Sequence, residues 1–375
     1  MRVFLIRNVE PINYGGGESY QIELAKVLVG NNIEPIIVSS SNKLLIEAQK
    51  NNFPSVRAPF LKQQNWSGWR NLFLPFYIFW QVRLYFWYKK QIKIYKPDVL
   101  DIQSRDDWIA ATLAAKKLNI TTLWTDHIDF RTWVLQNVNK AFKNPIGKKL
   151  LKIARDVDSI VMISDFEADY FRKTVYPKKY DNIKIIKNGV IDELNKYKDV
   201  LPKTKSICYV GRLVDYKGVS ELIRAFTLIE SNTATLHIYG EGADIEKYKK
   251  LAQKDKRISF YGYTENPIRA IAESEIFVLP SYYEGLSISL LQAAMLGKII
   301  IASNVDGNPE VVINKQTGLL VPPKDVDSLK NALMIGLSNK NEIKNLGKNI
   351  RKKYEKEFNF RTTIEKQLIP LFDRK

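Results

Sequence analysis

One stretch decides the fold of this chain: Pro280-Ser281-Tyr282-Tyr283-Glu284-Gly285-Leu286-Ser287-Ile288-Ser289-Leu290-Leu291-Gln292-Ala293-Ala294. It places a carboxylate, Glu284, on a glycine turn directly ahead of an apolar helix pattern. The first N–H groups of a helix lack partners within it, and the helix dipole adds to their attraction for an anion such as phosphate. A carboxylate beside them accepts hydrogen bonds from hydroxyl groups. The stretch therefore predicts a site for a phosphorylated, hydroxyl-rich ligand at the start of a helix.

A second stretch, about seventy residues upstream, carries two cations in the order Gly211-Arg212-Leu213-Val214-Asp215-Tyr216-Lys217-Gly218. It follows a predicted strand, Ser206 to Val210, so both cations lie at the carboxyl end of that strand. Arginine offers a planar fork to phosphate oxygens and lysine a compact point charge, and both stabilise negative charge on a departing diphosphate. An ordinary solvated surface pair is the alternative, and the bracketing glycines count against it.

Length and composition indicate a globular protein with two domains. The chain has 375 residues, more than one core usually serves, with 45% apolar and 26% charged residues. Its single cysteine, Cys208, excludes an internal disulfide and fits a reducing compartment. The run Met1 to Ile6 is followed at once by Arg7, which favours a first strand over a signal peptide. We therefore expect a cytoplasmic protein.

The charge balance favours anionic partners. The chain has 58 basic and 40 acidic residues, a formal charge of +18. Nucleic acid, an anionic membrane and phosphorylated substrates compete as the partner. We expect no nucleic-acid partner, because the sequence contains no zinc-finger spacing, RNP-like segment or basic zipper.

Strand-like and helix-like segments alternate in two series, which predicts α/β domains with parallel sheets. The first series has strands predicted at Arg2 to Asn8, Glu34 to Ser39, Val99 to Gln103, Thr121 to Trp124 and Ser159 to Ile163. The second has strands predicted at Ser206 to Val210, Thr235 to Tyr239, Ile258 to Tyr261, Glu275 to Leu279, Lys298 to Ala302 and Gly318 to Val321. Between them, the polar and lysine-rich stretch Asp192 to Lys205 predicts a linker. Ligands bind beyond the carboxyl ends of such strands, so two such domains offer a cleft between them.

The segment Phe60 to Lys96 holds 13 of the chain's 43 aromatic residues and seven lysines or arginines, but no acid. Its uninterrupted apolar run, Leu72 to Trp80, is too short to span a bilayer. Two interpretations remain open. The segment is either a helix packed on the sheet with a few exposed cations, or a contact with an anionic membrane surface or a lipid-linked acceptor.

The two stretches quoted first resemble those of glycosyltransferase family 4, also called glycosyl transferase group 1, whose members use nucleotide-sugar donors and have the GT-B fold. Shorter strings extend the resemblance in the family's order over nearly the whole chain, among them Ser164-Asp165-Phe166, Asn188-Gly189-Val190, Gly240-Glu241-Gly242 and Gly307-Asn308-Pro309-Glu310. The resemblance implies two Rossmann-like, doubly wound parallel-sheet domains that face a cleft. Residues 1–195, joined by a C-terminal helix at about 355–375, would form the acceptor-side domain. Residues 196–354 would bind the nucleotide sugar.

The resemblance also implies a donor site. Arg212 and Lys217 would hold the donor diphosphate, and Glu284 would accept hydrogen bonds from the donor sugar. We expect these three residues and His127 to be the catalytic residues. The backbone groups of five further donor-binding residues would complete the site. These residues are Gly211, Gly262, Gly285, Leu286 and Ser287.

Part of the implied site belongs to the first domain. Gly16 and Gly17 would lie over the donor phosphates, although their loop lacks the Lys-Ser/Thr pair of a P-loop and a plain tight turn is the alternative. His127 would lie beside the donor sugar, with a structural histidine as the alternative. His237 lies within a predicted strand and is interpreted as structural.

One donor-binding position departs from the family pattern. The family usually has a second glutamate eight positions after the first, which binds the ribose hydroxyls, and here that position is Gln292. An amide oxygen still accepts a hydroxyl proton, but charged hydrogen bonds are roughly twice as strong as neutral ones. We therefore expect a weaker or rearranged ribose contact.

We expect neither a metal nor a cofactor, because the nucleotide sugar is a co-substrate. Two Asp-x-Asp strings bear on the alternative of a carboxylate pair that holds a divalent metal. Asp325-Val326-Asp327 opens a helix pattern and is predicted to be an N-cap. Asp156-Val157-Asp158 precedes a strand and fits a surface turn.

These observations predict a metal-independent, retaining glycosyltransferase that moves a sugar from a UDP- or GDP-linked donor to a glycan or lipid-linked acceptor in surface polysaccharide or glycoconjugate synthesis. In the family the departing phosphate is thought to take the acceptor's proton, and Asp126 and Asp129 are the candidate bases otherwise. Two rivals remain, a sugar-phosphate-using synthase or phosphorylase of the same fold and a non-catalytic binding module at membranes. A peripheral position on the inner face of the cell membrane is left open.

Overall fold

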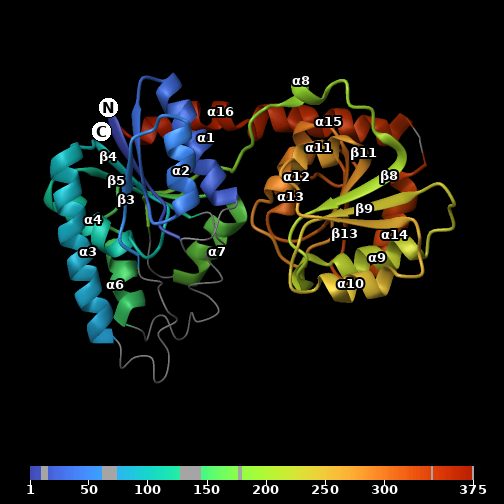
Figure 1. The fold of residues 1–375 in the computed structure, drawn as a ribbon, viewed down its shortest axis with the longest axis horizontal. Coiled ribbons are helices and arrows are strands. Elements are labelled where there is room, and N and C mark those ends of the chain that lie inside the picture. Colours follow the sequence, from blue (N-terminus) through green and yellow to red (C-terminus); the bar gives the residue numbers. More distant parts are fainter. Residues whose placement is uncertain (10–15, 61–73, 127–144, 176–179, 339–340, 374–375) are drawn as a thin grey trace. The chain divides into compact units, whose positions relative to one another are not determined.

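The chain forms two compact units, each built on its own parallel sheet (Figure 1). The computed structural model describes residues 1–9, 16–60, 74–126, 145–175, 180–338 and 341–373. Unit 1 comprises Met1–Ile186 and Arg361–Lys375, and unit 2 comprises Lys187–Phe360. From the sequence, we predicted that the chain passes from the first unit to the second after residue 195 and returns near residue 355. Two α/β units with parallel sheets confirm the predicted fold class.

The sheet of unit 1 has, within the described residues, seven parallel strands in the order β3-β2-β1-β4-β5-β6-β7. They are β1 (Arg2–Ile6), β2 (Glu34–Ser39), β3 (Ser55–Arg57), β4 (Val99–Ile102), β5 (Thr121–Asp126), β6 (Ser159–Met162) and β7 (Ile183–Ile185). The five strands predicted for this unit are confirmed. The sequence analysis missed β3 and β7, which are three residues long and lie at the two edges of the sheet, where a strand needs no long apolar run.

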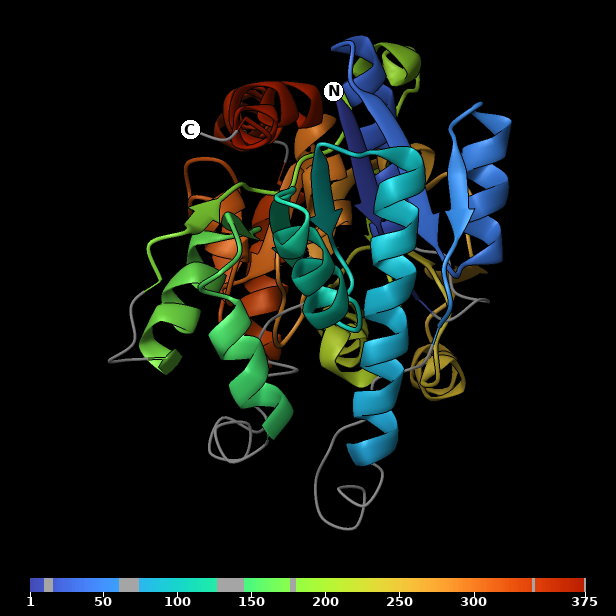
Figure 2. The same cartoon turned by 90° about the vertical axis from the view of Figure 1, so that its left-hand side faces the viewer.

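Helices of unit 1 connect these strands, and the figures show them against the sheet (Figures 1 and 2). They are α1 (Gly16–Gly30), α2 (Asn42–Lys50), α3 (Leu74–Tyr95), α4 (Trp108–Lys117), α6 (Pro145–Ile153) and α7 (Asp165–Val175). The start of α2 is capped by the Ser41 hydroxyl, which accepts from the Leu44 N–H at 3.3 Å. Phe4 and Ile6 of β1 contribute to the core on the α3 and α4 side of the sheet.

Helix α3 packs on unit 1 with one face only. Its buried residues recur every three or four positions, at Tyr77, Gln81, Leu84, Tyr88 and Ile92. The other face is also apolar but exposed, with Phe76, Phe79 and Phe86 between 56% and 61% exposed. Figure 2 shows α3 beside α4, and α4 in turn contacts α6. None of the helices in the part of the chain that the structure describes combines the length and apolar character needed to span a bilayer.

The sheet of unit 2 has, within the described residues, six parallel strands in the order β10-β9-β8-β11-β12-β13. They are β8 (Lys203–Val210), β9 (Thr235–Tyr239), β10 (Ile258–Gly262), β11 (Ser274–Leu279), β12 (Ile299–Ser303) and β13 (Leu319–Val321). All six predicted strands of the second series are confirmed. The predicted linker, however, contains the short helix α8 (Leu194–Tyr197) and the first residues of β8, so only part of it lacks regular structure.

The core of unit 2 lies on both faces of its sheet, which confirms the doubly wound arrangement. Successive residues of a strand point to opposite faces. Accordingly, Ile207 and Tyr209 of β8 join one core cluster, while Cys208 and Val210 join the other. The first cluster also includes buried residues of α9 (Val219–Thr227), α10 (Ile245–Ala252) and α14 (Val326–Gly336). The second includes those of α11 (Pro267–Ala272), α12 (Ile288–Met295) and α15 (Asn341–Glu357).

The segments that enter and leave unit 2 are paired with each other. Val190 forms an isolated parallel bridge with Asn359, and the Val190 carbonyl accepts from the Phe360 N–H at 3.0 Å. Gly189 fits closely here, because a Cβ at this position would lie 2.6 Å from the Phe358 carbonyl oxygen. The remaining C-terminal elements are α16 (Phe360–Thr363), a π-helical turn (Ile364–Leu368) and a 3₁₀ turn (Ile369–Leu371).

Candidate active site

The strand order of unit 2 reverses between β8 and β11, which pair in parallel. In open α/β sheets, ligands bind beyond the carboxyl ends of the strands at such a reversal. The loop after β8 carries residues 211–218, and the loop after β11 carries residues 280–287. The Tyr282 N–H donates to the Tyr216 carbonyl at 2.7 Å, so the two loops are in direct contact. The two stretches singled out in the sequence therefore meet where a ligand site is expected.

An ion pair joins the two loops. The Lys217 ammonium contacts Oε1 of Glu284, and the two side chains are only 12% and 11% exposed. The Ser281 hydroxyl donates to the same oxygen at 3.3 Å, and the Glu284 N–H donates to the Asp306 carboxylate at 2.9 Å. Glu284 is thus held through its backbone and through one carboxylate oxygen, which fixes where the other oxygen lies.

A tyrosine stack runs beside this ion pair. The rings of Tyr216 and Tyr283 stack with their centres 4.5 Å apart and their planes 14° apart. The guanidinium of Arg212 donates to the Tyr216 hydroxyl and lies 5.6 Å from the centre of its ring. The Lys217 ammonium lies 5.5 Å from the same ring centre. Tyr216 therefore positions both predicted phosphate-binding cations, and Tyr283 supports it from the opposite loop.

Gly218 allows the two loops to approach each other. Its φ is +69°, in the left-handed region, and a Cβ there would lie 2.0 Å from the Pro280 carbonyl oxygen. Only glycine fits both conditions. The glycine that brackets the cation loop in the sequence is therefore needed for the contact between the loops.

The start of α12 lies directly after Glu284. Ser287 is the N-cap residue, and its hydroxyl makes no capping hydrogen bond but lies 3.2 Å from the Ser289 hydroxyl. Leu286 is buried in the core, which anchors the turn. Gln292, in the second turn of α12, is half-buried. The first N–H groups of α12 supply donors of the kind that bind phosphate oxygens.

Gly262 lies farther along the same sheet edge. It ends β10 with φ of +72°, and its carbonyl accepts from the Gly240 N–H at 2.7 Å. Nearby, Tyr239 and Tyr261 stack with their ring centres 4.6 Å apart. His237 lies in β9, is buried and lies within 3.0 Å of the hydroxyls of Thr235 and Tyr261. Burial lowers the pKa of His237, and the positive charge of Lys203 lowers it further. The prediction that His237 is a structural strand residue is confirmed.

The first-domain candidates are described only in part. Gly16 and Gly17 are the first residues of α1, which confirms that the glycine run leads into a helix. His127 lies outside the described residues, and so does Asp129. Asp126 is the last residue of β5. The structure therefore brings Arg212, Lys217 and Glu284 of unit 2 together, while the predicted roles of the site residues in both units stay predictions.

The unit 1 sheet also reverses, between β1 and β4, and two buried carboxylates lie there. Asp107 accepts from Asn8 at 2.9 Å, from Tyr88 at 2.7 Å and from Ser104 at 2.5 Å. Burial raises the pKa of Asp107 to about 6, although these hydrogen bonds lower it. This residue was not predicted, because its neighbours along the chain do not reveal partners from α3 and from the segment after β1.

The second buried carboxylate of unit 1 is Asp101, within β4. It accepts from Thr125 at 2.7 Å and from Gln103 at 2.6 Å. Burial raises its pKa to about 6 against the effect of these two hydrogen bonds. Nearby, Arg7 and Glu18 form an ion pair at 3.0 Å with both side chains under 10% exposed. The sheet reversal of unit 1 is therefore occupied by polar side chains that hydrogen-bond to one another, although the Asn8 side-chain oxygen is buried without a partner.

Three of the four aspartates in the two Asp-x-Asp strings have structural partners. Asp325 caps α14, and its carboxylate accepts from the Ser328 N–H at 2.9 Å, so the predicted N-cap is confirmed. Asp158 accepts from the Thr122 N–H at 2.8 Å, and Asp156 pairs with Lys116 at 3.0 Å. Among the described residues, no group of three histidine, cysteine or carboxylate side chains is placed to hold a metal ion.

Fold and site together define a class of protein. Two parallel α/β units, the second with cations, a carboxylate and a helix N-terminus at its sheet reversal, are typical of proteins that bind phosphorylated ligands at that edge.

The family follows from two matches. The model of the "Glycosyl transferases group 1" matches residues 191–353, and that of "Glycosyltransferase Family 4" matches residues 14–194. Together the two cover well over half of the chain. The chain belongs to the group 1, or family 4, glycosyltransferases.

Relatives and solved structures agree with this assignment. An uncharacterized glycosyltransferase of Methanocaldococcus jannaschii is 31% identical over 246 residues, which cover 62% of this chain and 62% of the relative. A UDP-Gal:alpha-D-GlcNAc-diphosphoundecaprenol alpha-1,3-galactosyltransferase of Escherichia coli is 31% identical over 165 residues, 42% of each chain. The matches therefore span about two fifths to three fifths of these curated relatives. The structure of Anabaena HepE in complex with UDP has a TM-score of 0.77 at 14% identity and covers 99% of both chains, which shows the shared GT-B fold.

Proposed function

We propose that this chain is a retaining, metal-independent glycosyltransferase. It would transfer a sugar from a UDP- or GDP-linked donor to a glycan or lipid-linked acceptor in surface polysaccharide or glycoconjugate synthesis. The observation that carries the proposal is the contact between Lys217 and Glu284 at the sheet reversal of unit 2. Family membership supports the reaction class. The name of the Escherichia coli relative includes a UDP-linked galactose and a diphosphoundecaprenol-linked acceptor.

The cations would act on the leaving group. When the sugar departs, negative charge builds on the diphosphate, and fixed positive charge lowers the energy of that state. Lys217 is already held near this position by Glu284 and Tyr216, so little reorganisation is needed when charge develops. Arg212 is exposed and offers its planar fork to the same phosphates. The N–H groups at the start of α12 would receive further phosphate oxygens.

Glu284 would position the donor sugar. Its contacts with Lys217 and Ser281 both involve Oε1, which leaves Oε2 as the acceptor for a sugar hydroxyl. A carboxylate that accepts hydroxyl protons orients the sugar without bonding to it. In the reaction, the bond from the sugar C1 to the phosphate oxygen breaks and the bond to the acceptor oxygen forms on the same face. The acceptor's proton passes to the departing phosphate.

A thermal-shift experiment tests donor binding. We expect UDP or GDP, at a hundred times its dissociation constant, to stabilise the wild type by about 2.7 kcal/mol. The Lys217→Ala variant should lose this shift. Lys249→Ala is a matched control, because Lys249 forms an exposed ion pair with Glu246 on α10. Equal shifts in wild type and Lys217→Ala would overturn the assignment of the phosphate site.

Two further measurements test the mechanism. Proton NMR of the product should show the same anomeric configuration as the donor sugar, and inversion would contradict a retaining reaction. The rate should be undiminished in EDTA, and complete loss of activity in the chelator, restored by a divalent metal, would contradict metal independence.

We also propose that the chain works at the cytoplasmic face of an anionic membrane, through the segment 60–96. The described part of this segment supports the proposal, because α3 exposes Phe76, Phe79 and Phe86 and carries basic residues but no acid. Co-sedimentation with phosphatidylglycerol vesicles tests it. Absence of binding, or equal binding to neutral phosphatidylcholine vesicles, would contradict it.

One observation favours a second candidate function. Gln292 replaces the glutamate that the family usually carries, and a protein with weak nucleotide binding could serve as a binding module instead. The two proposals differ in whether the protein turns over a nucleotide sugar. Hydrolysis or transfer from a UDP- or GDP-linked sugar, abolished by Arg212→Ala, would exclude the binding module.

A further inference from the structure

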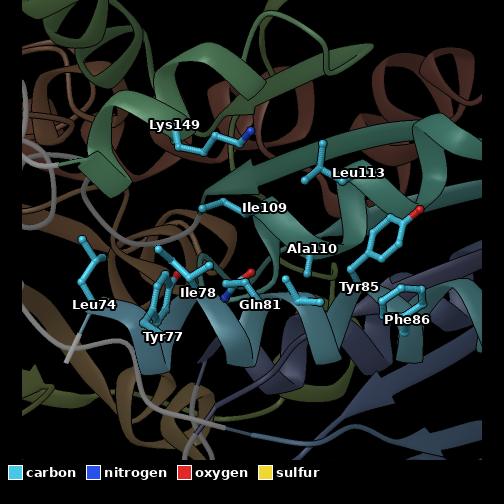
Figure 3. A pocket seen from close by; sticks show the side chains of 11 residues that line it. Leu74, Tyr77, Ile78, Gln81, Tyr85, Phe86, Ile109, Ala110, Leu113 and Lys149 are labelled. Atoms are coloured by element: carbon cyan, nitrogen blue, oxygen red, sulfur yellow. The ribbon is translucent and has the colours of Figure 1, made fainter.

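A cavity of about 620 Å³ lies in unit 1 between α3, α4 and α6. Its α3 wall is one stripe of the helix, at helical spacings, and α4 supplies the facing wall (Figure 3). The lining side chains are Leu74, Tyr77, Ile78, Gln81, Val82, Tyr85, Phe86, Ile109, Ala110, Leu113 and Lys149. The volume falls in the range of about 300–1,000 Å³ that small-molecule sites occupy.

The cavity is open along one side. Ile78, Val82 and Phe86 line it and are still 54%, 47% and 61% exposed. Apolar side chains at such an opening gain free energy when an apolar ligand removes them from water. The shape and lining therefore suit an elongated hydrocarbon chain.

One polar side chain of the cavity wall, Gln81, has an atom without a hydrogen-bond partner. The Gln81 side chain is 8% exposed, and its amide nitrogen donates to the Asp106 carbonyl at 3.0 Å. Its amide oxygen is buried and accepts no hydrogen bond. A buried polar atom without a partner is costly. This oxygen is shielded from the cavity as well as from solvent, so a ligand in the cavity does not reach it. Figure 3 shows the Gln81 side chain among the apolar side chains of the wall.

Among the described residues that line the cavity, the charged one is a cation. Lys149, on α6, is the charged residue that lines it. Helix α6 also carries Lys148 and Lys152, and neither α3 nor α6 contains an aspartate or glutamate. A hydrocarbon ligand with a phosphate head group would place its chain against α3 and its charge at these lysines.

We propose that this cavity binds the hydrocarbon chain of the lipid-linked acceptor, with Lys149 at the lipid phosphate. This inference rests on the proposed function, since it names the part of the acceptor that unit 1 holds. The chain lies along α3 beneath Ile78, Val82 and Phe86. The acceptor is thereby bound by its lipid as well as by its sugar.

Calorimetric titration with a short soluble probe, farnesyl phosphate below its micellar concentration, tests the inference. We expect saturable one-to-one binding to the full-length wild type and none of inorganic phosphate. Val82→Asp places a carboxylate in the opening and should weaken binding about tenfold or more. Phe79→Asp is the matched control, on the same helix and 59% exposed but outside the lining. Lys149→Ala should weaken binding severalfold, whereas its neighbour Lys148→Ala should not.

Each contrary result has a distinct meaning. Failure of the wild type to bind the probe, or equal binding by Val82→Asp and Phe79→Asp, would overturn the inference. UDP or GDP binding and transfer to a water-soluble acceptor are measured on the same variants. If these persist while the probe fails to bind, the inference fails and the proposed function stands.

Discussion

The sheet reversals of the two units have opposite electrostatic arrangements. In unit 2, a cation and a carboxylate pair with each other where two loops meet, and Lys217 and Glu284 are still 12% and 11% exposed. In unit 1, Asp101 and Asp107 are fully buried, and neutral hydroxyls and amides surround them. A charge paired with a charge can exchange its partner for a ligand, whereas a carboxylate held by several neutral donors cannot. The first arrangement suits catalysis and the second suits stability.

The largest expected effect breaks the unit 2 pair. Lys217→Ala should reduce turnover about 10²- to 10³-fold, the range for loss of one preorganised electrostatic donor. Its melting temperature should also fall, because Glu284 is left without its partner at a place where both side chains are largely buried. Steady-state kinetics and thermal denaturation measure the two effects. Loss of stability in place of turnover would make the two reversals alike.

The counterpart in unit 1 is Asp107→Ala. It should lower the free energy of unfolding by roughly 2–4 kcal/mol, because three buried donors lose their acceptor. Donor-nucleotide binding should be unchanged. Urea denaturation and nucleotide titration measure these outcomes. A variant of normal stability without activity would instead give Asp107 a part in the reaction.

The buried carboxylates also predict a pH dependence. Their pKa values are near 3.8 in the unfolded chain and about 6 in the folded one, so the folded state holds more protons between these values. Protonation of these carboxylates therefore adds to the free energy of unfolding. This contribution is fully present below about pH 4 and is lost as the pH rises through 6. Asp101→Asn should therefore flatten this part of the profile. Urea titrations of both proteins at several pH values test it, and parallel profiles would disprove the pKa shift of Asp101.

A smaller effect sharpens the role of the tyrosine stack. Tyr216→Phe keeps the stacked ring but removes the hydroxyl that accepts from Arg212. We expect about a fivefold loss in kcat/KM, equivalent to one hydrogen bond of about 1 kcal/mol. Tyr197→Phe, in the exposed α8, is the control with a hydroxyl bonded elsewhere. Equal activity of Tyr216→Phe and wild type would show that Arg212 needs no orientation from this hydroxyl.

The smallest expected effect concerns Gln292. Gln292→Glu should tighten UDP or GDP binding about two- to fivefold, since a charged acceptor bonds a ribose hydroxyl more strongly than an amide does. Isothermal titration of nucleotide into both proteins measures the change. Identical affinities would mean that this position does not reach the ribose.

The sequence predicts the strands of unit 2 well, because a parallel strand buried on both faces needs a continuous apolar run such as Phe277 to Leu279. It predicts β3 and β7 poorly, since three-residue edge strands carry no such run. In the site, glycines next to charged residues mark both loops. The pairing of Lys217 with Glu284 could not be predicted from residues alone, because 67 positions separate them and the sheet reversal brings them together.

Tertiary packing explains the rest. Asp107 gives little local signal, because two of its three partners, Asn8 after β1 and Tyr88 of α3, are distant in the chain. The segment around α3 supports both interpretations of its sequence, since one face is buried and the other is apolar and exposed. Composition alone cannot separate the two faces. The helical spacing of the buried residues Tyr77, Gln81 and Leu84 distinguishes the two faces once the packed face is known.

The bridge between Val190 and Asn359 has a consequence for how such proteins change over time. Unit 2 is a single uninterrupted stretch of chain, Lys187–Phe360, whose two ends meet at this bridge. A stretch with adjacent ends can be replaced as one cassette by recombination at two neighbouring splice points. The close fit of Gly189 against Phe358 and Phe360 has to be kept in such an exchange. A lineage could therefore acquire a new donor through one exchange while the gene segments for the other unit stay intact.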